Sequence, residues 1–131
     1  MWHGEGMERV LGIGGFFFRS EQADALARWY ADHLGVDGPG ESYDDPVWRQ
    51  QEGETVVAPF GPEHWASPHL GRTGWGINFR VADLDTMVAQ LRAAGIEVEV
   101  DAERYPNGRF AQLHDPDGNP VQLWQSMPPE G

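Results

Sequence analysis

Residues 114–124 read His-Asp-Pro-Asp-Gly-Asn-Pro-Val-Gln-Leu-Trp, which is the end of one predicted strand, a tight turn and a second strand. The turn residues each have a physical role. Pro116 fixes its own φ angle, the Asp115 side chain can accept hydrogen bonds from the nearby backbone, and Gly118 accepts a positive φ. Taken alone, this stretch predicts a β-hairpin. A pattern elsewhere in the chain places the hairpin in a larger, repeated unit.

A strand followed by a helix is predicted twice along the chain. The first copy consists of the apolar run 10–19 and a helix near 23–34, and the second consists of the run 74–81 and a helix near 83–95. In both helices the apolar residues recur at intervals of three and four, which is the period of one helix face. An internal repeat of this kind predicts two related modules.

The spacing of matching residues supports the repeat. Phe18 and Phe79 are offset by 61 residues (79 − 18), whereas Gly35 and Gly95, which are expected to end the two helices, are offset by 60 (95 − 35). Asp83 is the expected N-cap of the second helix. The helix region of the second copy is therefore one residue shorter.

Each copy is followed by further strand-like segments, at 47–51 and 55–60 in the first half and at 96–101, 109–114 and 120–125 in the second. We expect one domain over 10–126, made of module one (10–62) and module two (74–126), with the Gly-, Pro- and Ser-rich loop 61–73 between them. Residues 1–9 are expected to form a flexible N-terminal extension and residues 127–131 a C-terminal tail.

Composition excludes several classes of protein. The 131 residues are 40% hydrophobic and include six Trp and six Phe, which argues against a disordered chain. No apolar run is long enough to span a bilayer, and we expect no secretion signal. The formal charge of −12 disfavours nucleic acid and anionic membranes as partners and favours cationic ligands. The absence of Cys excludes disulfides and thiolate ligands and fits a cytoplasmic protein.

Together with the repeat, three stretches resemble the vicinal oxygen chelate superfamily, which holds glyoxalase I, bleomycin-resistance proteins, fosfomycin-resistance enzymes and extradiol dioxygenases. They are Arg-Trp-Tyr-Ala-Asp-His-Leu-Gly at 28–35, Asn-Phe-Arg-Val-Ala-Asp-Leu-Asp at 78–85 and the segment 108–124. The resemblance implies an α+β fold in which two tandem βαβββ modules form a cup-shaped curved sheet with the helices on its outer face. Members usually pair as dimers, so a homodimer is expected.

In catalytic members a divalent metal sits inside the cup. The resemblance places Gly15 and Gly76 at two of its ligand positions, and Gln122 at a third, where relatives carry Glu. The fourth falls within 55–60, which holds no carboxylate or imidazole. Such a metal needs three or four N or O donors at close range. We therefore predict no metal and no cofactor here, and we expect the two glycines to leave room for a ligand.

The histidines are the other potential donors. We expect His3 in the N-terminal extension, His33 on the surface of the first helix, and His64 and His69 in solvent within the inter-module loop. His114 differs because it ends a strand, where it either makes a structural hydrogen bond in the turn or acts as a general base.

Strand alternation predicts which side chains face the cup. The polar and aromatic members of each strand are expected to line an aromatic, amide- and arginine-rich cavity suited to an organic molecule. The predicted ligand-binding residues are Phe17, Arg19, Trp48, Gln50, Asn78, Arg80, Gln112, His114, Gln122 and Trp124.

Three functions remain open on sequence grounds. The first is a metal-independent protein that binds a small organic molecule, with Arg19 and Arg80 as a possible pair for an anionic group. The second is a lyase, isomerase or dioxygenase with a relocated metal, or with an acid–base pair such as His114 and an arginine. The third is an accessory dimer that binds no ligand. We rank binding first.

Overall fold

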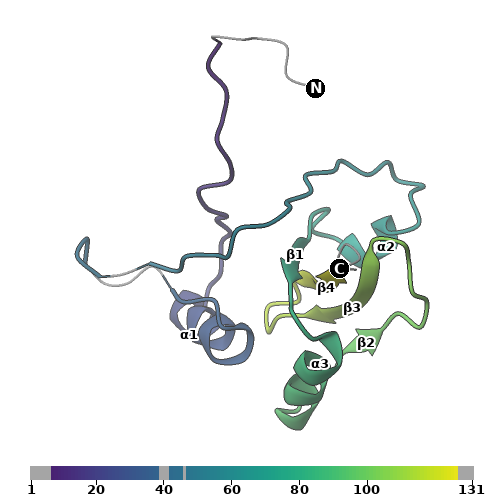
Figure 1. Cartoon of the computed structure of the whole chain (residues 1–131). Helices are drawn as coiled ribbons and strands as arrows, with labels where there is room; N and C mark the ends of the chain where they lie inside the picture. The colour runs from purple at the N-terminus through teal and green to yellow at the C-terminus, as the bar shows by residue number, and fades with distance from the viewer. Residues whose placement is uncertain (1–6, 39–41, 46, 127–131) are drawn as a thin grey trace.

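The second half of the chain forms a four-stranded sheet with a helix on one face (Figure 1). The computed structural model describes residues 7–38, 42–45 and 47–126. Its elements are α1 (Ala23–Trp29), the π-helical turn η1 (Tyr30–Leu34), α2 (Ser67–Leu70), β1 (Ile77–Arg80), α3 (Leu84–Ala93), β2 (Glu99–Val100), β3 (Gly108–His114) and β4 (Pro120–Ser126). The predicted α+β class is confirmed.

The sheet has the strand order β1-β4-β3-β2, with β1 parallel to β4 and the other two pairs antiparallel. This is the βαβββ arrangement predicted for module two. The register sets side chains of three strands in rows: Asn78 lies beside Gln122, which lies beside Gln112. In the next row on the same face, Arg80 lies beside Trp124.

The core lies between α3 and one face of this sheet. Leu84, Leu91, Val121 and Leu123 are its largest fully buried side chains. Burying such a side chain contributes about 2 kcal/mol through apolar surface removed from water. As predicted, Asp83 caps α3, because its carboxylate accepts a hydrogen bond from the backbone N–H of Thr86 at 3.0 Å.

The turn between β3 and β4 has the predicted chemistry. Oδ1 of Asp115 accepts hydrogen bonds from the backbone N–H groups of Asp117 and Asn119, both at 2.9 Å, and Gly118 has φ +85°. The other carboxylate oxygen, Oδ2, accepts the Tyr30 hydroxyl at 2.7 Å and the Asn119 amide at 2.8 Å. The buried Asp115 therefore joins the first-half helix to the second-half turn.

The first helix is confirmed, and its C-terminal end explains the one-residue difference between the two copies. The chain leaves α1 through η1, where the backbone N–H of Gly35 bonds to the Tyr30 carbonyl. A π-helical turn holds one residue more than an α-helical turn. Gly35, at φ +74°, then ends the helix as predicted, because a left-handed residue favours glycine.

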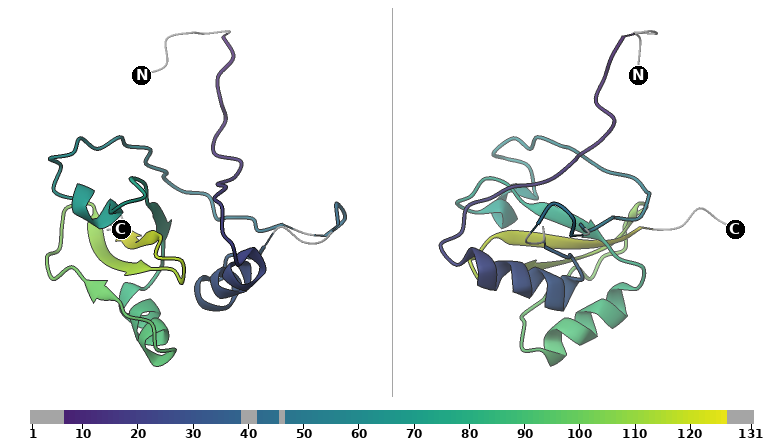
Figure 2. Two further views of the ribbon diagram at one scale, coloured as in Figure 1. Left: turned by 180° about the vertical axis from the view of Figure 1, so that it is seen from behind. Right: turned by 90° about the vertical axis from the view of Figure 1, so that its left-hand side faces the viewer.

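The other first-half segments differ from the prediction. Residues 10–19, 47–51 and 55–60 were expected as strands, but they run as extended chain without a strand partner in the described residues. Figures 1 and 2 show them as extended chain outside the sheet, and 47–51 contacts its edge strand β1. Their apolar side chains are exposed, Leu11 and Phe17 almost completely. A strand needs a neighbouring strand to pair its backbone groups, and sequence alternation does not supply one.

The structure describes only part of the two expected terminal segments. The part of the expected extension before residue 7, including His3, and the expected tail at 127–131 lie outside the described residues. Residues 7–9 are exposed and lie outside any helix or strand. None of the helices in the described part of the chain has the length and apolar character that crossing a membrane requires.

Candidate functional site

The sheet face opposite α3 carries a row of amides. The Asn78 amide donates to Oε1 of Gln122 at 2.7 Å, and Gln112 lies next to Gln122 on β3. Glu99 of β2 continues the row, because it is paired with Gln112. Primary amides offer both donors and acceptors, so this row can bind either kind of group on a ligand.

An aromatic wall lies next to the amide row. Phe110 and Trp124 are neighbours in the register, and their rings are nearly parallel, with centroids 6.2 Å apart. The indole N–H of Trp124 donates to the Asn107 carbonyl at 2.7 Å, which fixes the ring. Trp124 is only 6% exposed, so the half-buried Phe110 supplies most of the accessible apolar surface of this wall, backed by the fixed indole ring.

Arg80 lies at one end of this wall and is already engaged. Its guanidinium donates to the backbone carbonyl of Gln51 at 2.7 Å and packs against Gly53. The extended first-half chain therefore contacts the edge strand β1 at Arg80. The expected pairing of Arg80 with Arg19 as an anion site stays a prediction.

The short helix α2 covers the other end of the face. A side chain at Gly76 would meet Leu70, since a Cβ atom there would lie 2.8 Å from Leu70 Cδ2. The expected free space at Gly76 is therefore filled, because the inter-module loop folds back over the sheet. His69 directly precedes Leu70. Its Nε2 lies 3.3 Å from the Val121 carbonyl oxygen, and the centroid of its ring lies 5.2 Å from that of His114.

This position corrects the expectation that His64 and His69 are solvated. His69 is half-buried, and burial lowers its pKa below the usual range, with the neighbouring His114 acting in the same direction. His64 is also half-buried, stacked on Phe60 with ring centroids 4.1 Å apart. His33 lies in the last turn of its helix, as expected, with its ring near that of Trp29.

His114 borders a recess of about 710 Å³ that also includes His69, Arg92, Glu97 and Glu99. The arginine of this recess donates to the Val98 carbonyl at 2.8 Å. The site arginine Arg80 is two strands away from His114 and lies at the opposite end of the rows.

The residues at the superfamily's metal position do not fit a divalent metal. Gly76 supplies no donor, Leu70 occupies the space in front of it, and Oε1 of Gln122 accepts the Asn78 amide. Across the described residues, no three His, Asp or Glu side chains are arranged to hold an ion. We therefore derive no chemistry through a metal here.

The structure gathers six of the ten predicted ligand-binding residues on this face: Asn78, Arg80, Gln112, His114, Gln122 and Trp124. Their role in binding stays a prediction. Sequence reasoning missed Leu70, because a four-residue helix carries no periodicity; the Ser67-Pro68 pair was its one signal, since Pro favours the first turn of a helix.

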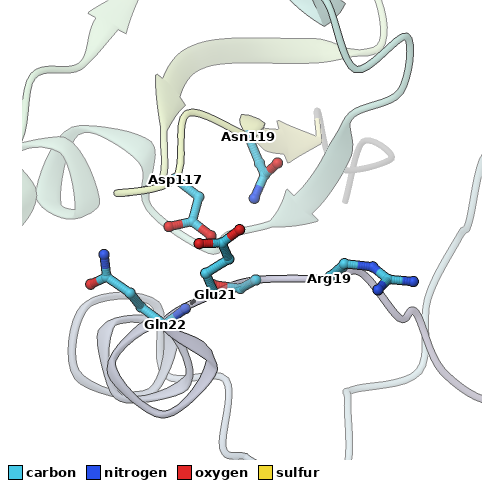
Figure 3. A pocket seen from close by; sticks show the side chains of 6 residues that line it. Arg19, Glu21, Gln22, Asp117 and Asn119 are labelled. Atoms are coloured by element: carbon cyan, nitrogen blue, oxygen red, sulfur yellow. Dashed lines mark hydrogen bonds between the residues drawn. The ribbon is translucent and has the colours of Figure 1, made fainter.

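The other four predicted residues lie elsewhere within a single chain. Phe17 is 93% exposed, Gln50 is exposed, and Trp48 contacts the ring of Phe79. Arg19 borders a separate recess of about 400 Å³ between the start of α1 and the β3–β4 turn. Figure 3 shows the carboxylates of Glu21 and Asp117 turned toward each other there, while the Arg19 side chain points away.

Comparison with known proteins identifies the family. The sequence matches the Glyoxalase/Bleomycin resistance protein/Dioxygenase superfamily over residues 12–123. The chain belongs to this superfamily. Among curated proteins, no sequence matches it.

The fold agrees with that of a solved structure. TnmS3 from Streptomyces sp. CB03234, described as an antibiotic binding protein, is 22% identical with a TM-score of 0.61; the match covers 92% of this chain and 100% of that one. A glyoxalase/bleomycin resistance protein from the same organism is 38% identical with a TM-score of 0.35, and the match covers 38% of this chain. This chain spans only 43% of that relative's length.

Proposed function

We propose that this superfamily member binds a small organic molecule, without a metal, on the sheet face opposite α3. The observation that carries the proposal is the amide row of Asn78, Gln122 and Gln112 beside the Phe110–Trp124 stack. Oriented polar groups next to a fixed apolar surface are the usual composition of a small-molecule site. The description of TnmS3 as an antibiotic binding protein agrees with this function.

The chemistry of the face favours an aromatic amine. The aromatic wall offers stacking, the amides accept hydrogen bonds from N–H groups, and Glu99 adds a carboxylate to the same row. The net charge of −12 attracts cations over longer range.

A thermal-shift and calorimetric titration of the full chain with aromatic amines, after treatment with a chelator, tests the proposal. We expect micromolar binding that the chelator does not weaken. Gln112→Ala, on the proposed face, should weaken binding about tenfold, since one hydrogen-bonding partner is lost. Gln90→Ala, an exposed glutamine of α3, is the matched control and should leave binding unchanged.

Two results oppose the proposal. Stoichiometric transition metal in the purified protein, measured by mass spectrometry, contradicts metal independence. Equal loss of binding in Gln112→Ala and Gln90→Ala shows that the ligand binds elsewhere.

We also propose that the chain functions as a homodimer. Among the described residues, all 14 large exposed hydrophobic residues lie between Met7 and Trp65, in or beside segments whose sequence has strand character but which have no strand partner in that part of the structure. So many exposed apolar side chains are unusual on a monomer. A second copy offers matching segments with unpaired backbone groups. A cytoplasmic location stays a prediction.

Light scattering after size-exclusion chromatography tests this assembly. We expect twice the 14.6 kDa mass of one chain. Val57→Asp, in the exposed first-half chain, should shift the mass toward one chain, because it places a charge in the apolar interface. Ala89→Asp, on the exposed side of α3, should not. A single-chain mass at high protein concentration contradicts the proposal.

A further inference from the structure

The helix α2 forms a wall at one end of the proposed ligand face. A side chain at Gly76 would point toward Pro120 and Leu70. Because side chains two residues apart on a strand lie on the same face, this is also the face that carries Asn78. Leu70 therefore stands one row before the amide row. Two residues along a strand correspond to about 7 Å, so a ligand on the amides lies close to the Leu70 methyl groups.

Contacts on both sides of Leu70 hold this wall in place. On the preceding side, the His69 ring packs against His114 and lies next to the Val121 carbonyl. On the following side, the Thr73 hydroxyl lies 2.8 Å from both the Leu70 carbonyl and the Trp75 carbonyl, and can donate to either. The loop thus returns tightly from α2 into β1, which leaves Leu70 little freedom to move away from Gly76.

We propose that Leu70 is a specificity-determining residue, which limits how far an organic ligand extends along β1 and β4 beyond the amide row. The inference rests on the proposed binding function. Its physical basis is steric: the methyl groups fill the space over Gly76, so a longer ring system meets them, whereas a shorter one does not.

Three aromatic amines of increasing length test the inference. The probes are 2-aminonaphthalene, 2-aminoanthracene and 1-aminopyrene, each titrated by fluorescence into the full chain and into Leu70→Ala. The wild-type chain should bind the two-ring amine best. Leu70→Ala should bind 1-aminopyrene about tenfold more tightly than the wild type does, since removed methylene groups at a pocket wall have effects of this order. Its affinity for 2-aminonaphthalene should change less than twofold.

Leu34→Ala is the matched control, because Leu34 is also a half-buried leucine but packs against the core cluster next to α3. It should leave the order of the three affinities unchanged. Leu70→Val removes less volume and should give an intermediate gain for 1-aminopyrene, which keeps the test valid if Leu70→Ala unfolds.

The outcomes separate the two proposals. If neither the wild-type chain nor Leu34→Ala binds any probe, the binding function fails and the inference falls with it. If the wild type binds but Leu70→Ala changes all three affinities equally or none of them, the inference alone is overturned. A measurement without ligand tests the contact between Leu70 and Gly76 directly. The Leu70 methyl protons should show a nuclear Overhauser effect to the Gly76 Hα protons, and the absence of this effect also overturns the inference.

Discussion

The two halves of the chain share one sequence pattern and have different structures. The second half forms a four-stranded sheet, buries Leu84, Val121 and Leu123 completely, and caps its helix with Asp83. The first half forms its helix, but its apolar segments remain extended and exposed. A helix satisfies its backbone groups internally, whereas a strand depends on a neighbour. The pattern therefore predicts helices in one chain more securely than it predicts strands.

The largest expected difference between the halves is in the response to a leucine truncation. Leu123→Ala should lower the free energy of unfolding by about 3 kcal/mol, because it leaves a cavity between α3 and the sheet. Leu11 is fully exposed in the first-half run. At protein concentrations low enough to keep the protein monomeric, Leu11→Ala should change the free energy of unfolding by less than about 0.5 kcal/mol. Urea unfolding measures both. Equal losses would mean that the first half is packed as tightly as the second.

Tyr30→Phe tests the link between the halves. It removes the hydroxyl that donates to the buried Asp115, and we expect the free energy of unfolding to fall by about 1.5 kcal/mol, since hydrogen bonds to charged groups are strong. Tyr105→Phe, which removes a hydroxyl bonded to Asp101 in a less buried place, should have a smaller effect. The reverse order would show that the link contributes little.

The pH dependence of the same residue gives a second measurement. Burial, together with the hydrogen bond to Asp115, raises the pKa of Tyr30 above its usual range. Above about pH 10 the unfolded chain therefore loses this proton while the folded chain retains it, and stability falls as the pH rises. Tyr30→Phe should lack this part of the alkaline loss.

Helix capping gives a smaller contrast between the halves. Asp83→Ala removes the side-chain cap of α3 and should lower Tm by about 3 °C. Gln22, the corresponding residue before α1, makes no side-chain cap bond, so Gln22→Ala should leave Tm nearly unchanged. Differential scanning calorimetry compares them, and a similar loss from both changes would contradict the capping argument.

The smallest expected effect is a loss of stability at acid pH that arises from His69, where α2 contacts the sheet. Because burial depresses the pKa of His69, the unfolded chain binds a proton more readily than the folded chain below about pH 6.5. Stability should therefore decrease as the pH falls from about 6.5 toward the lowered pKa. His69→Gln should flatten this slope. An unchanged slope in His69→Gln would assign the acid sensitivity to another group.

Particular residues show what the sequence could predict. The Asp115 turn, the Asp83 cap and the alternation of Gln122 with Leu123 depend on neighbours within a few positions, and all were predictable. Two other contacts depend on how the loops fold back onto β1. Leu70 packs over Gly76, and Arg80 donates a hydrogen bond to the Gln51 carbonyl. No local pattern encodes those contacts. The absence of strand partners for the described segments of the first half is likewise a property of tertiary structure.

The π-helical turn after α1 has a consequence for insertions and deletions. Losing one residue from an ordinary helix rotates everything after it by about 100°, which would turn a buried side chain into solvent. At η1 the wider π-helical turn already holds one residue more than an α-helical turn. Deleting Ala31 should therefore convert this π-helical turn into an α-helical turn, as in the second copy, with Gly35 still ending the helix. This turn is the one place in α1 and η1 where such a change in length should be neutral.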